Sequence, residues 1–299
     1  MARLPTFLII GAARSGTTAL YDYLKQHPGI YMTPRKETNF FAFEGETLAC
    51  KGPGADYINN SMTSLAEYEA LFEAAPEGAA RGEACPLYLY AEKAPARIHR
   101  RVPDARLVAI LRNPIEQAYS HYLYAKRQTI EPAEDFVKAL TLEEERLKAG
   151  WQPLFGYSRF PRYFEQLSRY TALFPRDQLK LFLYEDFDAK PLDVLAELFR
   201  FVGVDDGFAP DVSHRPNAGG TPKNQRFQDF LMKPNPLTRI AAAVIPYDLR
   251  RRIRDALAAR NMERDDMPAE ARARLVAALR DDVLRLQDLV GRDLISWLS

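Results

Sequence analysis

The segment FLIIGAARSGTTAL, residues 7–20, constrains the fold of this chain more than any other. It passes from an unbroken apolar run, through two glycines separated by four residues, into a stretch with apolar residues at helical spacing. An unbroken apolar run is typical of a strand buried on both faces, as in a parallel sheet. A strand, a glycine turn and a helix in this order are the outline of a phosphate-binding loop. The nucleoside-triphosphate form of that loop has a lysine after the second glycine, where this chain has Thr17.

The loop between this strand and helix carries groups that bind anions. Backbone N–H groups and the positive end of the helix dipole favour a negative charge at such a turn. Arg14 adds a planar, permanently charged fork that suits the oxygens of a phosphate or a sulfate. A tight turn without a ligand is the structural alternative, but a polar run directly after a buried strand favours the anion site. We therefore expect an anion at Ala12, Ala13, Arg14, Ser15, Gly16, Thr17 and Thr18.

The rest of the chain alternates strands with helices. Apolar runs predict strands at 5–10, 30–33, 80–84, 105–112 and 178–187. Helical spacing and stop signals predict helices at 17–27, 65–74, 94–101, 114–127, 134–149, 158–173 and 191–202. Long loops are expected at 44–60 and 205–225, and an apolar stripe at Leu275, Leu279, Val283, Leu286 and Val290 predicts a packed C-terminal helix. The prediction is an α/β fold with a P-loop-type parallel sheet flanked by helices and a helical C-terminal portion, as one domain over 1–299.

Composition excludes several function classes. The net charge is +1, so no basic field is available to attract nucleic acid. Cys50 and Cys85 are the only cysteines and lie far apart in the sequence, so they do not make a disulfide framework and favour a reducing, cytoplasmic location. The longest apolar runs are too short for a signal peptide or an integral membrane segment. The four histidines, His27, His99, His121 and His214, are scattered without ligand spacing, so we expect no metal.

A second segment, LRNPIEQAYSHY at residues 111–122, follows another predicted strand. Arg112 stands at the carboxyl end of that strand, where open α/β sheets bind ligands. Asn113 is a candidate helix cap, and Ser120 lies two turns along the same helix. Arg112 and Ser120 could together hold a second phosphate. Taken alone, a solvated arginine and an ordinary helical serine are the better interpretation.

Together, the two segments resemble the sulfotransferases that use 3′-phosphoadenosine-5′-phosphosulfate (PAPS) as the donor and release adenosine 3′,5′-bisphosphate (PAP). GAARSGTTAL is similar to the 5′-phosphosulfate loop of that family. RNPIEQAYSHY is similar to its 3′-phosphate segment, in which an arginine and a serine eight residues later bind the 3′-phosphate. The resemblance implies PAPS as the donor, without a metal, and assigns the 3′-phosphate to Arg112 and Ser120.

Further segments resemble the heparan-sulfate and bacterial branch of the same family. TPRKETNFF, residues 33–41, is similar to a Lys-Glu segment in which the glutamate acts as the base, which implies that role for Glu37. GEACPLYLY, residues 82–90, is similar to a Gly-Glu segment and makes Glu83 the second candidate, although Ala84 replaces a lysine that is frequent there. The ending GRDLISWL, residues 291–298, is also similar. Arg14 stands where many members have a lysine.

The resemblance implies a role for each candidate residue, and each role has a structural alternative. Glu37 would take a proton from the acceptor, Arg14 would stabilise the leaving phosphate, and Lys36 would contact donor or acceptor. The alternative for Glu37 is a surface pair with Arg35 or Lys36, and for Glu83 a buried carboxylate bonded to backbone N–H groups. Phe41 and Tyr88 line the acceptor pocket or pack in the core. Tyr157 and Lys223 fall where family members approach the nucleotide, and a solvated basic loop is the alternative for Lys223.

Two other functions compete with a sulfotransferase. A P-loop kinase of a small molecule would need the lysine that Thr17 replaces, so it ranks lower. A non-catalytic nucleotide-binding protein would keep the loop and need no base. The acceptor is a small molecule or a glycan, and a carbohydrate, a lipid, a phenol and a secondary-metabolite alcohol all stay open. The sequence has no signal for an oligomeric state.

Overall fold

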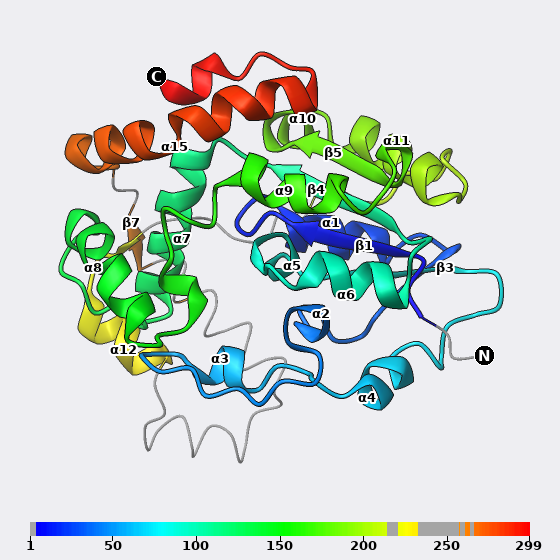
Figure 1. Ribbon diagram of the computed structural model, residues 1–299, viewed down its shortest axis with the longest axis horizontal. Helices are drawn as coiled ribbons and strands as arrows, with labels where there is room; N and C mark the ends of the chain where they lie inside the picture. The colour runs from blue at the N-terminus through cyan, green and yellow to red at the C-terminus, as the bar shows by residue number, and fades with distance from the viewer. Residues whose placement is uncertain (1–3, 214–220, 233–256, 258–260, 264–265) are drawn as a thin grey trace.

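A five-stranded parallel sheet forms the centre of the protein (Figure 1). The computed structural model describes residues 4–213, 221–232, 257, 261–263 and 266–299. The strands are β1 (Phe7–Gly11), β2 (Ile30–Met32), β3 (Ala80–Ala84), β4 (Arg106–Leu111) and β5 (Leu179–Leu183). They lie in the order β2-β3-β1-β4-β5, and every neighbouring pair is parallel. The strand before the glycine loop is therefore central, with partners on both sides.

Alternation along β1 buries both faces of the sheet. Leu8 and Ile10 join one apolar cluster, whereas Phe7 and Ile9 join the cluster on the other face. All four side chains are fully buried. This two-sided burial explains why the segment reads as an unbroken apolar run rather than as an alternating one.

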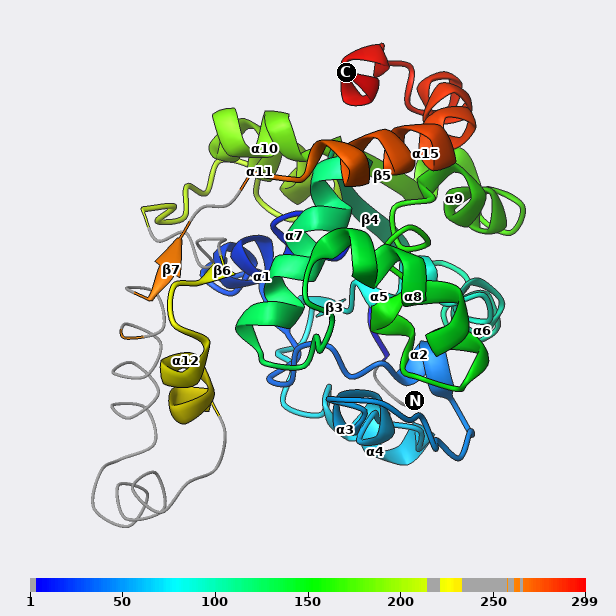
Figure 2. The ribbon, with the colours of Figure 1, turned by 90° about the vertical axis from the view of Figure 1, so that its left-hand side faces the viewer.

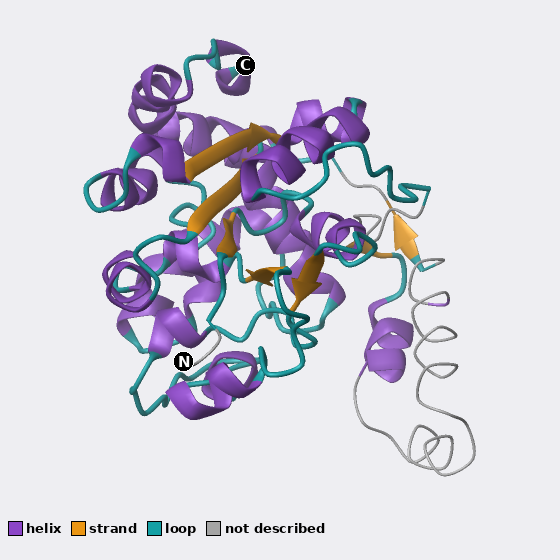
Figure 3. Cartoon of the chain, turned by 90° about the vertical axis from the view of Figure 1, so that its right-hand side faces the viewer, coloured by secondary structure: helices purple, strands orange, loops and turns teal. Residues whose placement is uncertain are grey.

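Helices cover the two faces (Figure 3). The first half of the chain contributes α1 (Thr17–Leu24), α2 (Phe40–Phe43), α3 (Asp56–Asn59), α4 (Leu65–Ala70), α5 (Leu87–Tyr90), α6 (Ala94–Arg101), α7 (Pro114–Arg127) and α8 (Phe136–Lys148). The second half contributes α9 (Tyr163–Thr171), α10 (Tyr184–Ala189), α11 (Pro191–Val202), α12 (Gln225–Met232) and α15 (Ala269–Val290). Short 3₁₀ turns lie at Pro153–Phe155, Arg176–Gln178 and Ile295–Leu298, and β6 (Thr221–Pro222) pairs antiparallel with β7 (Met262–Glu263).

The predicted fold class is confirmed, and several element boundaries were wrong. The strand expected at 178–187 ends at Leu183, and its last residues begin α10. The helix expected from residue 158 begins only at Tyr163, because Pro161 disfavours a helical residue before it. The loop expected at 44–60 contains the single turn α3, and the single turns α2 and α5 were missed. Part of the loop expected at 205–225 lies outside the described residues.

The C-terminal helix and the start of α7 follow the predictions. Leu275, Leu279, Val283 and Leu286 are all buried, so the predicted stripe is the packed face of α15. α15 crosses over α7 and α9 (Figure 2). The Asn113 side chain caps α7 by accepting hydrogen bonds from two backbone N–H groups of the first turn, at 2.9 and 3.3 Å. Within the described ranges, no helix combines the length and apolarity that a membrane span requires.

Candidate functional site

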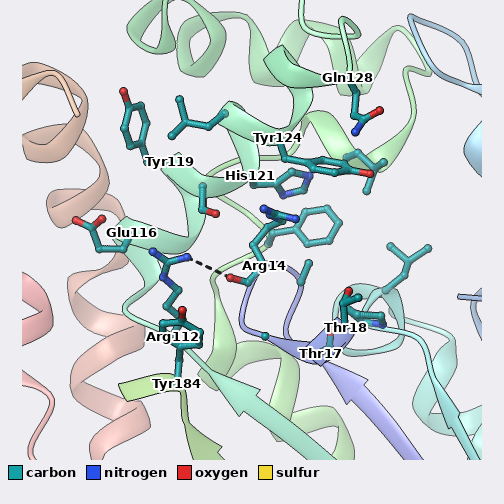
Figure 4. Close-up of a pocket in the computed structure, with 18 of the residues that line it drawn as sticks. Arg14, Thr17, Thr18, Arg112, Glu116, Tyr119, His121, Tyr124, Gln128 and Tyr184 are labelled. Atoms are coloured by element: carbon teal, nitrogen blue, oxygen red, sulfur yellow. Dashed lines mark hydrogen bonds between the residues drawn. The ribbon is translucent and has the colours of Figure 1, made fainter. Parts of the chain in front are cut away.

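The loop between β1 and α1 is held by side chains from the neighbouring β4 and α7. Gln117 Nε2 donates a hydrogen bond to the Ala13 carbonyl at 3.0 Å. Arg112 Nη1 donates to the Arg14 carbonyl at 3.3 Å (Figure 4). Arg112 and Gln117 both belong to the segment LRNPIEQAYSHY, residues 111–122. This segment therefore fixes the shape of the loop after β1.

Gly16 lies where the loop turns into α1, at a φ of 88° that favours glycine. A Cβ there would lie 3.2 Å from Cε1 of the Phe187 ring. We expect Gly16→Ala to destabilise the fold by about 1–2 kcal/mol through backbone strain and to lower anion affinity as well. Urea unfolding measures the first effect, and calorimetric titration with PAP measures the second.

Gly45→Ala is the matched control, because Gly45 has a φ of 72° and a Cβ there would meet no atom within 4 Å. Gly45→Ala should lose stability through backbone strain alone and leave PAP binding unchanged. Equal stability losses together with unchanged PAP affinity in both variants would contradict a tight, functional turn at Gly16.

The Arg14 guanidinium lies inside the protein with an unused donor. Its Cζ is 4.6 Å from the centre of the Tyr124 ring, and its Nε has no hydrogen-bond partner. Burial, with the charge of Arg127 next, lowers the pKa of Arg14 to about 10. A buried cation with a free donor is costly without an anion beside it. The arrangement therefore fits a bound phosphate or sulfate.

A cavity of about 900 Å³ opens in front of this loop (Figure 4). Its wall includes the predicted residues Ala13, Arg14, Gly16, Thr17, Thr18, Glu37, Arg112 and Ser120. The structure thus brings together the loop after β1, the base candidate before α2 and the arginine–serine pair of α7. Ala12 and Ser15 of the same loop are buried and do not line the cavity. The Cζ of Arg112 lies 5.0 Å from the centre of the Tyr184 ring.

Glu37 reaches the cavity from a loop fixed against β3. Its backbone N–H donates to the Ala84 carbonyl at 3.0 Å. Its carboxylate accepts hydrogen bonds from Lys36 Nζ and, at 2.6 Å, from the Tyr57 hydroxyl. Burial raises the pKa of Glu37, but the charge and hydrogen bond of Lys36 and the Tyr57 hydrogen bond outweigh it, so the pKa lies below its usual value. Glu37 is therefore an ionised carboxylate at neutral pH, available as a proton acceptor.

Glu83, the second base candidate, lies away from the cavity. Its side chain is fully buried and accepts hydrogen bonds from Thr38, from Tyr68 at 2.6 Å and from Tyr88 at 2.9 Å. Burial raises the pKa of this carboxyl. Because Thr38 follows Glu37 directly, the bond from Thr38 to Glu83 anchors the loop that carries Glu37. The alternative of a buried, hydrogen-bonded carboxylate therefore fits Glu83, and its hydrogen-bond donors here are the hydroxyls of Thr38, Tyr68 and Tyr88.

Five other predicted residues do not line the cavity, and one of them is Lys36, which pairs with Glu37. Phe41, Tyr88 and Tyr157 are fully buried, and the Tyr157 hydroxyl donates to Glu131 at 2.6 Å. Lys223 is exposed, and its backbone N–H donates to the Asn261 carbonyl at 2.6 Å. The core alternative therefore fits Phe41 and Tyr88, whereas Tyr157, expected to approach the nucleotide, is buried away from the cavity.

Sequence reasoning missed several residues of the cavity wall: Tyr57, Glu116, His121, Tyr124, Tyr184 and Arg272. Tyr184 directly follows β5, so its position at the carboxyl end of a strand was a usable signal. Arg272 comes from α15 and pairs with Glu116 at 2.7 Å. No local pattern predicts that contact, because the two residues are far apart in the sequence.

His121 lines the cavity next to Ser120 and is only 3% exposed. Its Nδ1 has no partner, and burial together with the charge of Arg14 lowers its pKa to about 3. Since the usual value is 6.5, the unfolded chain takes up a proton below that pH and the folded chain does not until about pH 3. Stability should therefore fall as the pH falls from 6.5 toward 3.

We expect His121→Phe to remove this loss, so that between pH 7 and pH 5 the variant loses about 2 kcal/mol less stability than the wild type. Urea unfolding at the two pH values measures it. The control is His99→Phe at an exposed position, which should keep the wild-type dependence. Equal pH dependence in wild type and His121→Phe would show that His121 is not held neutral by burial.

The site therefore combines an anion loop, a second cationic position and an ionised carboxylate around one cavity. In the part of the chain that the structure describes, no group of three or more His, Cys, Asp or Glu residues could hold a metal. Such a site can bind a doubly phosphorylated ligand and deprotonate a hydroxyl beside it.

The known proteins to which this chain is similar include sulfotransferases of several organisms. The chain is 23% identical to the membrane-associated sulfotransferase kil1 of Dictyostelium discoideum over 306 residues, covering 77% of this chain and 62% of that protein. It is 27% identical over 218 residues to the human bifunctional heparan sulfate N-deacetylase/N-sulfotransferase 3, covering 68% of this chain and 22% of that protein. The chain thus spans less than two thirds of the length of either relative.

A solved structure and a family model cover more of the chain. A sulfotransferase from Alicyclobacillus acidocaldarius superposes with a TM-score of 0.77 at 30% sequence identity, over the full length of both chains. The model described as the sulfotransferase family matches residues 5–209, which include the loop after β1, Glu37, Arg112 and Ser120. The resemblance seen in the sequence is confirmed, and the chain belongs to the sulfotransferase family.

Proposed function

We propose that this protein transfers the sulfuryl group of PAPS to a hydroxyl group of an acceptor. The observation that carries the proposal is the shared cavity of Arg14, Arg112, Ser120 and Glu37. Two separate cationic positions on one wall fit a ligand with two separate phosphates. Membership of the sulfotransferase family supplies the reaction type.

The residues present fit the nucleotide. The guanidinium of Arg14, the N–H groups of the loop and the hydroxyls of Thr17 and Thr18 would hold the 5′-phosphosulfate. Arg112 and Ser120 would hold the 3′-phosphate. The positive φ of Gly16 lets the backbone approach the ligand closely.

The charges that develop during sulfuryl transfer indicate a role for each residue of the site. The donor supplies a sulfuryl group whose bond to the 5′-phosphate breaks, leaving the electron pair on that phosphate, while the acceptor oxygen bonds to sulfur. Glu37 takes the acceptor proton as that bond forms, because it is ionised and faces the cavity. Arg14 and the loop N–H groups stabilise the charge left on the phosphate. Lys36 and Tyr57 orient the Glu37 carboxylate.

Calorimetric titration with PAP tests the nucleotide site. We expect PAP to bind more tightly than adenosine 5′-monophosphate, since only PAP places a phosphate at Arg112. Arg112→Ala should weaken the binding of PAP about tenfold more than that of the monophosphate, through loss of a charge-assisted contact. Loss of the hydrogen bond from Arg112 to the Arg14 carbonyl affects both nucleotides alike.

Equal affinities of the wild type for the two nucleotides would contradict the assignment of Arg112. Tight binding of ATP together with magnesium-dependent ATP turnover would favour the kinase instead. A protein that binds PAP and never forms it from PAPS would be the non-catalytic alternative. The cytoplasmic location expected from cysteine usage stays a prediction.

A further inference from the structure

Part of the cavity wall is apolar or aromatic. This part includes Tyr57, Pro86, Leu87, Leu123, Tyr124, Ile130, Leu154 and Phe160. Tyr57 keeps 42% of its surface exposed. Apolar surface left open on a concave wall favours an apolar ligand.

Contacts place these side chains around the proposed reaction centre. The Tyr57 hydroxyl donates to Glu37 at 2.6 Å, and Arg14 lies over the Tyr124 ring at 4.6 Å. Phe160 contacts His121, with ring centres 4.8 Å apart. In Figure 4 the Arg14 guanidinium lies beside Tyr124 and His121, whereas Glu116 lies toward Arg112. Tyr57 therefore adjoins the proposed base, and Tyr124 adjoins Arg14.

Few charges are available on this wall to hold an anionic acceptor. The cationic side chains of the cavity, within the described ranges, are Arg14, Arg112 and Arg272. Arg272 pairs with Glu116, and Arg112 belongs to the nucleotide side. Arg14 is committed to the donor in the proposed function, and Lys36 is paired with Glu37. His121 is uncharged at neutral pH, because its pKa is about 3.

A neighbouring cavity of about 650 Å³, to which Leu87 also contributes, does not supply a basic extension. Its wall has five glutamates against four cationic residues. Three of the four cations form ion pairs with glutamates of the same wall, namely Lys93 with Glu46, Arg159 with Glu144 and Arg169 with Glu165. A polyanion would meet a surface that is already neutralised.

We infer that the acceptor is an uncharged hydroxyl compound with an apolar, ring-containing skeleton, and not an anionic glycan. This inference rests on the proposed function, because it assigns the acceptor to the Glu37 side of the same cavity. The skeleton packs on Tyr57, Tyr124 and Phe160, and its hydroxyl points to the Glu37 carboxylate. Gln128 and His121 are the neutral polar groups that complete the wall.

Titration of the PAP-saturated protein with two probes tests the inference. The neutral probe is 2-naphthol, and the anionic probe is an unsulfated tetrasaccharide of alternating glucuronic acid and N-acetylglucosamine. We expect 2-naphthol to bind at least about tenfold more tightly than the tetrasaccharide. Leu154→Arg should weaken 2-naphthol by about tenfold or more, since it puts a charge on the apolar wall, and leave PAP affinity unchanged.

Leu192→Arg is the matched control, because Leu192 is 44% exposed on α11 and does not line the cavity. It should change the affinity for neither 2-naphthol nor PAP. Ile130→Asn is a milder second variant that should weaken 2-naphthol if Leu154→Arg fails to fold.

Tighter binding of the tetrasaccharide, or binding of neither probe while PAP binds normally, would overturn the inference and leave the proposed function standing. Unchanged 2-naphthol affinity in a folded Leu154→Arg or Ile130→Asn variant would overturn it too. Absence of PAP binding to the folded wild type would instead remove the proposed function, and the inference with it.

Discussion

Replacing Arg14 by alanine is expected to lower kcat/KM for sulfuryl transfer by about 100- to 1,000-fold, the range typical for loss of one preorganised donor at a developing charge. Stability should stay unchanged or rise. The side chain is partly buried, its Nε is buried without a partner and its pKa is lowered to about 10, so it carries a desolvation cost in the free protein. Transfer rates with PAPS and urea unfolding of the same preparation measure the two quantities.

Arg285→Ala is the control. Arg285 makes the same kind of contact, with its Cζ 4.1 Å from the Phe164 ring centre, and does not line the cavity. It should change kcat/KM by no more than about twofold, as is usual for substitutions away from a site. Loss of activity in Arg14→Ala that follows a matching loss of stability would reduce Arg14 to a structural residue.

Glu37→Gln is expected to lower kcat by about 100- to 10,000-fold, the contribution of a positioned general base. The amide keeps the size of the side chain and can still accept from Tyr57, so PAP affinity should stay within about twofold. Single-turnover rates and calorimetry separate these effects. An unchanged kcat, measured where chemistry limits the rate, would rule out Glu37 as the base.

The pH profile distinguishes Glu37 from Glu83. The pKa of Glu37 lies below the ordinary value of 4.5, so the midpoint of the acid limb of kcat/KM should lie below that pH. The pKa of Glu83 is raised above 4.5 by burial, so a profile governed by Glu83 would begin to fall at a higher pH. An acid limb that lies above 4.5 and disappears in Glu83→Gln would transfer the role to Glu83.

Much of this site could be predicted because its residues follow the ends of strands. The loop after β1 and Arg112 after β4 meet at one edge because the two strands are parallel neighbours. Their polar side chains interrupt apolar runs, which makes them visible in the sequence. Glu37 was reached only through resemblance, since its local pattern alone fits a surface ion pair.

Other features depend on tertiary contacts that no local pattern encodes. Glu83 and Tyr88 belong to the GEACPLYLY segment, which resembles a family motif, but their hydrogen bonds turn them inward, where they support the loop rather than line the cavity. Tyr157 is drawn to Glu131 in the same way. Arg272 reaches the cavity because α15 crosses over α7. Burial and long-range pairing decide such positions, and both appear only once the chain has folded.

The most direct test of the account is the conversion of PAPS to PAP by the purified protein, followed with ³⁵S-labelled donor and a panel of neutral alcohols and glycans. The account predicts PAP formed in equal amount with a labelled acceptor, at a rate lost in both Arg14→Ala and Glu37→Gln. A folded protein that binds PAP but transfers label to no acceptor, or an Arg14→Ala variant as active as the wild type, would contradict it.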